Sequence, residues 1–188
     1  MMLSKHISMR NMMAMALLLT AASALAQQPT ATGVINATLV NKNGISIQFD
    51  TDPAGVTLGS AGTNAATANF GAVSAFGPLS GGVTRPTITA ASYTVRTIFD
   101  VQVVQGGLTS TTYTLTANLA AAAPTGLSYK VDAITLTAAS QTVQVNGAYN
   151  ADVAHNLDLV VSTSAPGAGG PAVGTPISTV INFTATAN

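Results

Sequence analysis

The chain has 188 residues, with six basic and six acidic side chains. Charged residues make up 6% of it, against about 25% in an ordinary globular protein, whereas hydrophobic residues make up 47%. That hydrophobic content argues against a disordered chain, and the balanced charge argues against a nucleic-acid-binding surface, which would be basic. Because the sequence contains no cysteine, disulfides, thiolate zinc sites and cysteine nucleophiles are excluded.

Residues 1–26 have the pattern of a secretory signal peptide. Lys5 and Arg10 give a basic start, residues 13–19 form an apolar run, and the Ala-Leu-Ala sequence at 24–26 is typical of a cleavage site. The apolar run is shorter than the roughly 20 residues that cross a bilayer. We therefore expect a secreted protein, extracellular or at the cell surface, with no membrane span once the leader is removed.

After the leader, apolar and polar residues alternate with the period of two that is typical of β-strands. The clearest alternating segments are 32–40, 93–103, 111–119 and 177–186, and shorter segments bring the total to about nine or ten strands. Strands of this number and spacing, separated by turns, are typical of a sandwich or a barrel. The sequence predicts an all-β protein, specifically an Ig-like or jelly-roll β-sandwich.

Turn residues predict how some of these strands pair. Asn43-Gly44 suits a hairpin between 33–40 and 45–49. Gly106-Gly107 predicts a second hairpin, between the long segments 93–103 and 111–119. A further turn is expected at Asn146-Gly147, and short strands are expected at 56–58 and 66–70. Two segments rich in Gly, Ser and Pro are expected to be loops, 71–86 and 165–176.

Calcium is the only cofactor for which the sequence gives a signal. Asp50 and Asp52 precede Gly55 with the spacing of positions one, three and six of a calcium loop. Position five is Ala54, and position twelve, where a bidentate Glu is expected, is Ala61. The segment therefore has the sequence of a turn, with Asp50 and Asp52 as the candidate calcium ligands.

The sequence offers little for catalysis. His155 is the one histidine after the leader, and it lies close in sequence to Asp152 and Asp158. In a strand, His155 and Asp158 face opposite sides, so we expect all three at turns or facing solvent. Neither a Gly-x-Ser-x-Gly elbow nor a distinctive pair of carboxylates is present. We therefore expect no enzyme and assign no catalytic residue.

The segment 27–40 is a polar tether followed by an alternating strand with small residues, and it precedes a sandwich domain at 41–188. Such a strand can complete its own sheet, or it can be added to the sheet of another copy. In strand addition, main-chain hydrogen bonds join an exposed edge and alternate side chains enter pockets. The residues by themselves leave both arrangements open.

The leader, this N-terminal strand, the Thr-, Ala- and Val-rich strands and the closing segment 177–188 together resemble bacterial surface filament subunits assembled by donor-strand exchange. These families include Ig-like pilins of the chaperone–usher type, spore coat protein U-like secreted pilins and camelysin-like biofilm matrix fibre proteins. The chain differs from the chaperone–usher pattern in having Ala187, not an aromatic residue, at the penultimate position, and in lacking a cysteine pair.

The resemblance implies a structural subunit that polymerises with copies of itself into an extracellular filament, such as a pilus or fibre. It also implies help from a periplasmic chaperone or an outer-membrane assembly protein. The donor strand would then present one face to its acceptor, made of Ala31, Gly33, Ile35, Ala37 and Leu39.

A monomeric cell-surface adhesin or carbohydrate-binding module is the alternative. Its binding site would be formed by the loops at 71–86 and 165–176. Sugar-binding sites usually present stacking aromatic rings, and these two loops contain one aromatic residue, Phe76. The sequence therefore favours the filament subunit.

Overall fold

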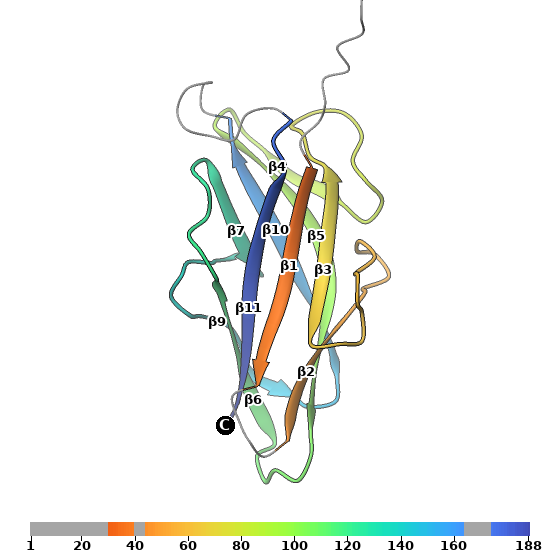
Figure 1. Ribbon diagram of the computed structural model, residues 1–188, viewed down its shortest axis with the longest axis vertical. Helices are drawn as coiled ribbons and strands as arrows, with labels where there is room; N and C mark the ends of the chain where they lie inside the picture. The colour runs from red at the N-terminus through yellow and green to blue at the C-terminus, as the bar shows by residue number, and fades with distance from the viewer. Residues whose placement is uncertain (1–29, 40–43, 164–173) are drawn as a thin grey trace, which may run out of the picture.

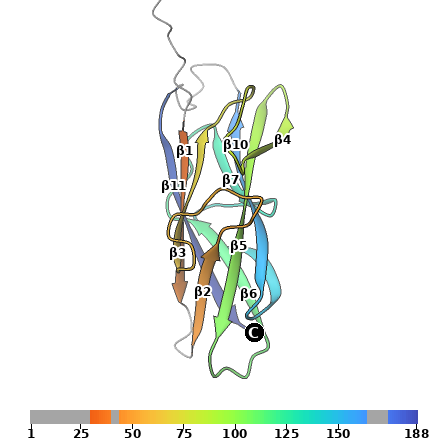
Figure 2. The ribbon, with the colours of Figure 1, turned by 90° about the vertical axis from the view of Figure 1, so that its right-hand side faces the viewer.

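The computed structural model describes residues 30–39, 44–163 and 174–188. In these segments eleven β-strands and no helix form two sheets that pack face to face (Figures 1 and 2). This confirms the predicted all-β sandwich, with slightly more strands than expected. Within the same segments, no helix is long and apolar enough to cross a membrane.

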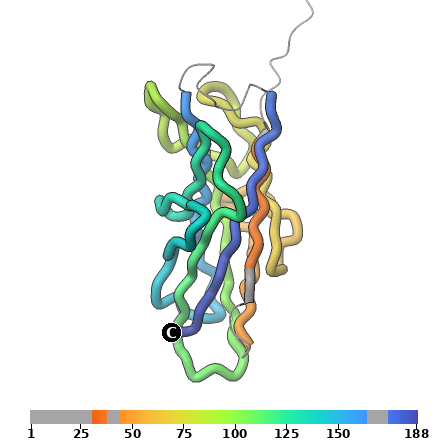
Figure 3. The backbone as a smooth tube through the Cα atoms, turned by 60° about the vertical axis from the view of Figure 1, so that its left-hand side comes forward, coloured from red at the N-terminus to blue at the C-terminus, as the bar shows by residue number. Residues whose placement is uncertain are grey.

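The first sheet has five strands in the order β3-β1-β11-β6-β9. Their bounds are Ala65–Ala72 for β3, Thr30–Leu39 for β1, Ile177–Ala187 for β11, Thr112–Leu119 for β6 and Gln141–Ala148 for β9. β1 is antiparallel to β3 but parallel to β11, and Figure 3 shows β1 and β11 side by side. The remaining described pairs in this sheet are antiparallel.

The second sheet has the order β2-β5-β10-β7-β8, and β4 pairs with another part of β5. Their bounds are Ile45–Asp50 for β2, Ser92–Gln105 for β5, Asp152–Ser162 for β10, Leu127–Val131 for β7, Ile134–Thr135 for β8 and Thr84–Ile88 for β4. β4 thus begins inside the segment predicted to be a loop. All pairs described in this sheet are antiparallel.

Two predicted hairpins are wrong. β1 and β2 belong to different sheets, and so do β5 and β6. Both connections cross from one sheet to the other, because a strand with one apolar face can cover the core from either side. At one end of the sandwich, the amide of Gly106, which follows β5, donates to the carbonyl of Gly44, which precedes β2, over 2.7 Å.

The predicted turn at Asn146-Gly147 is also wrong, because both residues lie inside β9. The register between β9 and β6 shifts here, and Asn146 has a φ of 53°. A Cβ at Gly147 would lie 2.3 Å from Cζ of Tyr113, so only glycine fits against that ring. The chain turns after the strand, where Asn150 has a φ of 59°.

The segment 56–58 is not a strand, although Val56 and Leu58 are buried as predicted. Its amides donate to side chains instead of to a neighbouring strand. The amide of Val56 donates to Oγ1 of Thr97 over 2.8 Å, and that of Leu58 donates to Oγ1 of Thr51 over 3.0 Å. Threonine hydroxyls therefore satisfy backbone groups that a sheet would otherwise satisfy.

Aromatic rings join the two sheets at the centre of the core. Phe183 of the first sheet contacts Phe49 and Phe99 of the second, with ring centroids 5.4 Å and 5.8 Å away in edge-to-face arrangements. All three rings are buried. Tyr129 lies in the same core, and burial raises the pKa of its hydroxyl to about 12.

Candidate assembly site

β1 lies between two strands of the first sheet and forms hydrogen-bonded pairs with both. Ala31, Gly33 and Ile35 of the predicted donor face are buried, with Ala31 3% exposed and Ile35 fully enclosed. Ala37 is half-buried and packs against the core. The backbone of Leu39 pairs with β11, while its side chain lies outside the described residues. The face predicted from alternation is therefore the inward face of β1.

β1 completes a sheet of its own chain, which is one of the two arrangements that the sequence left open, but its partners differ from the expected one. As an ordinary first strand, it was expected to pair with β2, and instead it pairs with β3 and β11. β1 is the first strand of the described residues, and the other strands of its sheet all come later in the sequence. A strand in this position completes a sheet that is otherwise built from later parts of the chain.

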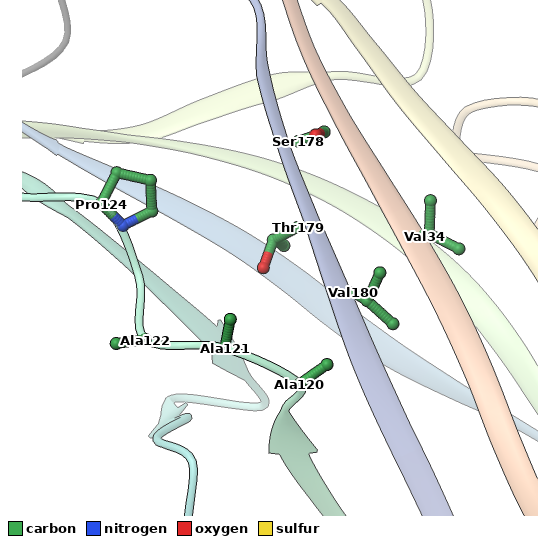
Figure 4. Close-up of a pocket in the computed structure, with 8 residues that line it drawn as sticks. All are labelled: Val34, Ala120, Ala121, Ala122, Pro124, Ser178, Thr179 and Val180. Carbon is green, nitrogen blue, oxygen red and sulfur yellow. The ribbon is translucent and has the colours of Figure 1, made fainter.

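The outer face of the sheet beside β1 carries a shallow apolar groove with a volume of about 260 Å³ (Figure 4). It is formed by residues of β1 and β11 and by the segment that follows β6. Its lining residues carry no charge and are Val34, Ala120, Ala121, Ala122, Pro124, Ser178, Thr179 and Val180.

His155 is buried, at 2% exposed, so the expectation that it faces solvent is wrong. Its Nδ1 lies 2.5 Å from Oδ2 of Asp132, and among the described residues its buried Nε2 has no hydrogen-bond partner. Asp132 and Ala133, with φ of 48° and 70°, form the tight turn between β7 and β8 that brings this carboxylate to the histidine. The sequence gives no sign of this contact, because 22 residues separate its two partners.

The pKa of Asp132 reflects two opposing effects. Burial by itself raises it, but hydrogen bonds from His155 and from the backbone and side chain of Asn156 outweigh burial. The result is a pKa below the usual value for aspartate. This carboxylate and the histidine act as a structural pair that ties the β7–β8 turn to β10.

Asp158 is also buried, at 4% exposed, which contradicts the expected position at a turn or in solvent. Arg96 binds it through two bonds, Nε to Oδ1 over 2.6 Å and Nη2 to Oδ2 over 2.8 Å. The hydrogen bond to Asp158 raises the pKa of Arg96. As predicted, His155 and Asp158 face opposite sides of β10. Asp152 is exposed, as expected, and accepts a hydrogen bond from Gln102.

Of the two candidate calcium ligands, Asp52 lies in a turn and Asp50 ends β2. Oδ1 of Asp52 accepts a hydrogen bond from the amide of Ala54 over 2.6 Å, and its carbonyl accepts one from Gly55 over 2.9 Å. Asp50 lies at the end of β2, directly opposite Asp100 of β5. In the segments that the structure describes, no group of three or more metal-ligating side chains could hold a metal ion.

Four aspartates nevertheless share one region of the second sheet. Burial raises the pKa of Asp100, and the negative charges of Asp52, Asp152 and Asp50 raise it further. Like charges that face each other across neighbouring strands destabilise a sheet. The arrangement is therefore an electrostatic cost to the folded chain.

Phe76 is the most exposed large hydrophobic side chain in the described chain, at 75%. Its loop is held by Arg85 of β4, whose Nε donates to the carbonyl of Ser74 over 2.9 Å and whose Nη2 donates to that of Gly77 over 3.2 Å. Sequence analysis singled out the aromatic residue but missed the arginine, since its partners lie eight and eleven residues away.

Comparisons with known proteins assign no family to these features. Neither a protein-family model nor a curated protein matches the chain. The geometry of β1 and the charge pattern of its neighbours are therefore the grounds for a function.

Proposed function

We propose that this protein is a secreted structural subunit that assembles with copies of itself into an extracellular filament by exchanging β1. One observation carries the proposal. The first described strand lies inside a sheet, paired on both sides, with its alternate side chains buried in a core made by the rest of the chain. If β1 left its own sheet, the position between β3 and β11 would be open to the β1 strand of a second copy, whose alternate side chains could fill the same core.

The strands that hold β1 carry no charge that would oppose pairing with a second copy. The sequences of β1, β3 and β11 contain no Lys, Arg, Asp or Glu. Charged residues and proline are the usual protection of a strand edge against pairing with another chain. Without β1, the facing edges of β3 and β11 would form an unprotected acceptor.

A disulfide that fixes β1 in its own sheet tests the proposal. Val34 and Val180 are directly opposite each other in the β1–β11 pair and both are half-buried on the outer face. Paired residues in neighbouring strands lie within the 4.4–6.8 Å Cα separation that a disulfide requires. The Val34→Cys/Val180→Cys chain is purified as a reduced monomer, oxidised in dilute solution, concentrated and imaged by negative-stain electron microscopy.

The matched control is Thr116→Cys/Thr184→Cys, which joins β6 to β11 and leaves β1 unrestrained. We expect filaments from the wild-type chain, from the oxidised control and from the reduced β1 variant, and none from the oxidised β1 variant. Filaments from the oxidised β1 variant would show that assembly does not need β1 to leave its own sheet, and the proposal would fail.

The loop of Phe76 supports a second candidate function, a surface adhesin or carbohydrate-binding module. Arg85 holds this loop, and an exposed aromatic ring is the usual stacking surface for a sugar. The test is binding to a glycan array by the wild-type chain and by Phe76→Ala. Binding lost in the variant would support this function, and equal signals from both proteins would exclude Phe76 as its site.

A further inference from the structure

If β1 is exchanged between copies, as the proposed function requires, the direction in which it enters its acceptor determines which assembly forms. β1 ends at the same end of the sandwich at which β2 begins (Figures 1 and 2). We call this the hinge end, and Gly44 and Gly106 form part of it. A strand exchanged in the direction seen here, parallel to β11, would therefore end at the hinge end of its acceptor.

The linker between the strand and the body of its own chain is short. About five Cα-to-Cα steps separate Leu39 from Gly44, and an extended chain covers roughly 17 Å in that number of steps. Leu39 would lie at the hinge end of the acceptor, and Gly44 lies at the hinge end of the donor. The two hinge ends must therefore come within that distance of each other.

We infer that exchange of β1 in this direction is reciprocal and closes into a two-fold symmetric dimer. When the hinge ends meet, the β1 strand of each copy is within reach of the vacant position in the other. Both strands are then used and both positions are filled. The contact is the same for the two copies, as a closed two-fold interface requires, and no free strand remains to add a third copy.

The two-fold dimer is the smallest closed assembly in which every β1 strand and every vacant position is used. It therefore loses less translational and rotational freedom on association than any larger ring built with the same contact.

The dimer preserves the contacts of the monomer. Every hydrogen bond between β1 and its neighbours forms again between chains, so the main cost is that of association, and the dimer is favoured by high concentration. Gly44 and the segment 106–111, which form part of the hinge end, carry no charged side chain. The partner is therefore a second copy of this chain.

The dimer competes with the filament for the same strand. A filament needs the donor and acceptor connections at opposite ends of each subunit, so that every copy can join two others. Exchange in the direction of the structure places both connections at the hinge end. The dimer thus withholds β1 from polymerisation until it dissociates.

Two cysteine pairs distinguish the directions of exchange. Thr32 is opposite Ser178 in the parallel register, and both face outward. The matched pair is Thr32→Cys/Thr184→Cys, whose positions are too far apart in this register for a disulfide but come together if β1 is reversed about Ile35. Each double variant, as the chain from Gln27 onward, is refolded at high concentration, oxidised and analysed by non-reducing electrophoresis and light scattering.

For Thr32→Cys/Ser178→Cys we expect covalent dimers as the largest crosslinked species and a particle of twice the monomer mass. A ladder of trimers and larger species from this variant would overturn closure but leave the proposed strand exchange intact. Intrachain crosslinks alone, in a sample that contains filaments, would overturn both the inference and the role of β1 in assembly. A ladder from the Thr32→Cys/Thr184→Cys variant alone would show reversed exchange and overturn the dimer.

Discussion

Ile35 of β1 lies directly beside Ile181 of β11 in a parallel register, and both side chains are completely buried. The two residues lie 146 positions apart in the sequence. Their contact joins the first and last described strands of the chain at the centre of one sheet. The stability of the fold and its proposed assembly thus depend on the same strand.

Truncating Ile35 tests how much β1 contributes to the fold. We expect Ile35→Ala to lower the free energy of unfolding by about 2–4 kcal/mol, because it removes a buried side chain and leaves a cavity. The matched control is Asn36→Ala, one position along on the outward face, with an effect below about 1 kcal/mol. Urea denaturation of both variants measures the difference. Equal effects would show that the inward face of β1 is not part of the core.

A substitution at Gly33, on the same face, is expected to raise the free energy of unfolding instead of lowering it. A Cβ built there lies 3.8 Å from both the carbonyl oxygen of Ala68 and Cδ2 of Leu157, which is ordinary contact. Gly33→Ala is expected to raise the free energy of unfolding by about 0.5 kcal/mol, since alanine restricts the unfolded chain. The control is Gly147→Ala, which would clash with Tyr113 and is expected to destabilise. Destabilisation by Gly33→Ala would contradict the predicted fit.

The pairing of Asp132 with His155 predicts a dependence of stability on pH. The folded pKa of Asp132 lies below its unfolded value of about 3.9. Its charge therefore stabilises the fold above that value, and the stabilisation is lost as pH falls through the folded pKa. Asp132→Asn should lower the free energy of unfolding at pH 6 and approach the wild type in strong acid.

Denaturation of wild type and Asp132→Asn across pH 2–7 measures this dependence. Asp152→Asn, which changes an exposed carboxylate of β10, is the control and should have a much smaller effect. A deficit in Asp132→Asn that stays constant down to the lowest pH would contradict a role for the carboxylate charge.

For Asp100, the effect of the carboxylate charge on the free energy of unfolding should have the opposite sign to that for Asp132. Its folded pKa is raised, first by burial and then by the three neighbouring aspartates, so its ionised form destabilises the fold at neutral pH. Asp100→Asn is expected to raise the free energy of unfolding by about 0.5 kcal/mol at pH 7, the scale of a surface charge interaction. The gain should disappear as pH falls through the raised pKa. A variant less stable than wild type at pH 7 would refute the repulsion.

Alternation along the chain was sufficient to predict the fold class and the inward face of β1. The pattern that buries Ala31, Gly33 and Ile35 is local, because neighbouring residues of a strand point to opposite sides. Pairing partners were not predictable in the same way. Asn43-Gly44 has the composition of a hairpin turn, yet the strands on either side of it lie in different sheets.

The side-chain pairs of the second sheet could not be predicted from local sequence either. Arg96 and Asp158 lie 62 positions apart, and they meet only because β5 and β10 are neighbours in a particular register. His155 was expected at a turn or facing solvent, but the turn at Asp132 supplies a half-buried carboxylate that pairs with the buried ring. Contacts of this kind depend on the order of strands, which local sequence does not specify.

The central claim is that β1 of one copy replaces β1 of another, and mixing two single-cysteine chains tests it most directly. Thr32→Cys is refolded with Ser178→Cys and, separately, with Thr184→Cys, and each mixture is oxidised and its disulfides are mapped by mass spectrometry. The first mixture reports exchange parallel to β11 and the second reports reversed exchange. We predict a disulfide between position 32 of one chain and β11 of the other in at least one mixture. If neither mixture contains such a disulfide under conditions in which the wild-type chain assembles, β1 stays in its own sheet and the account is wrong.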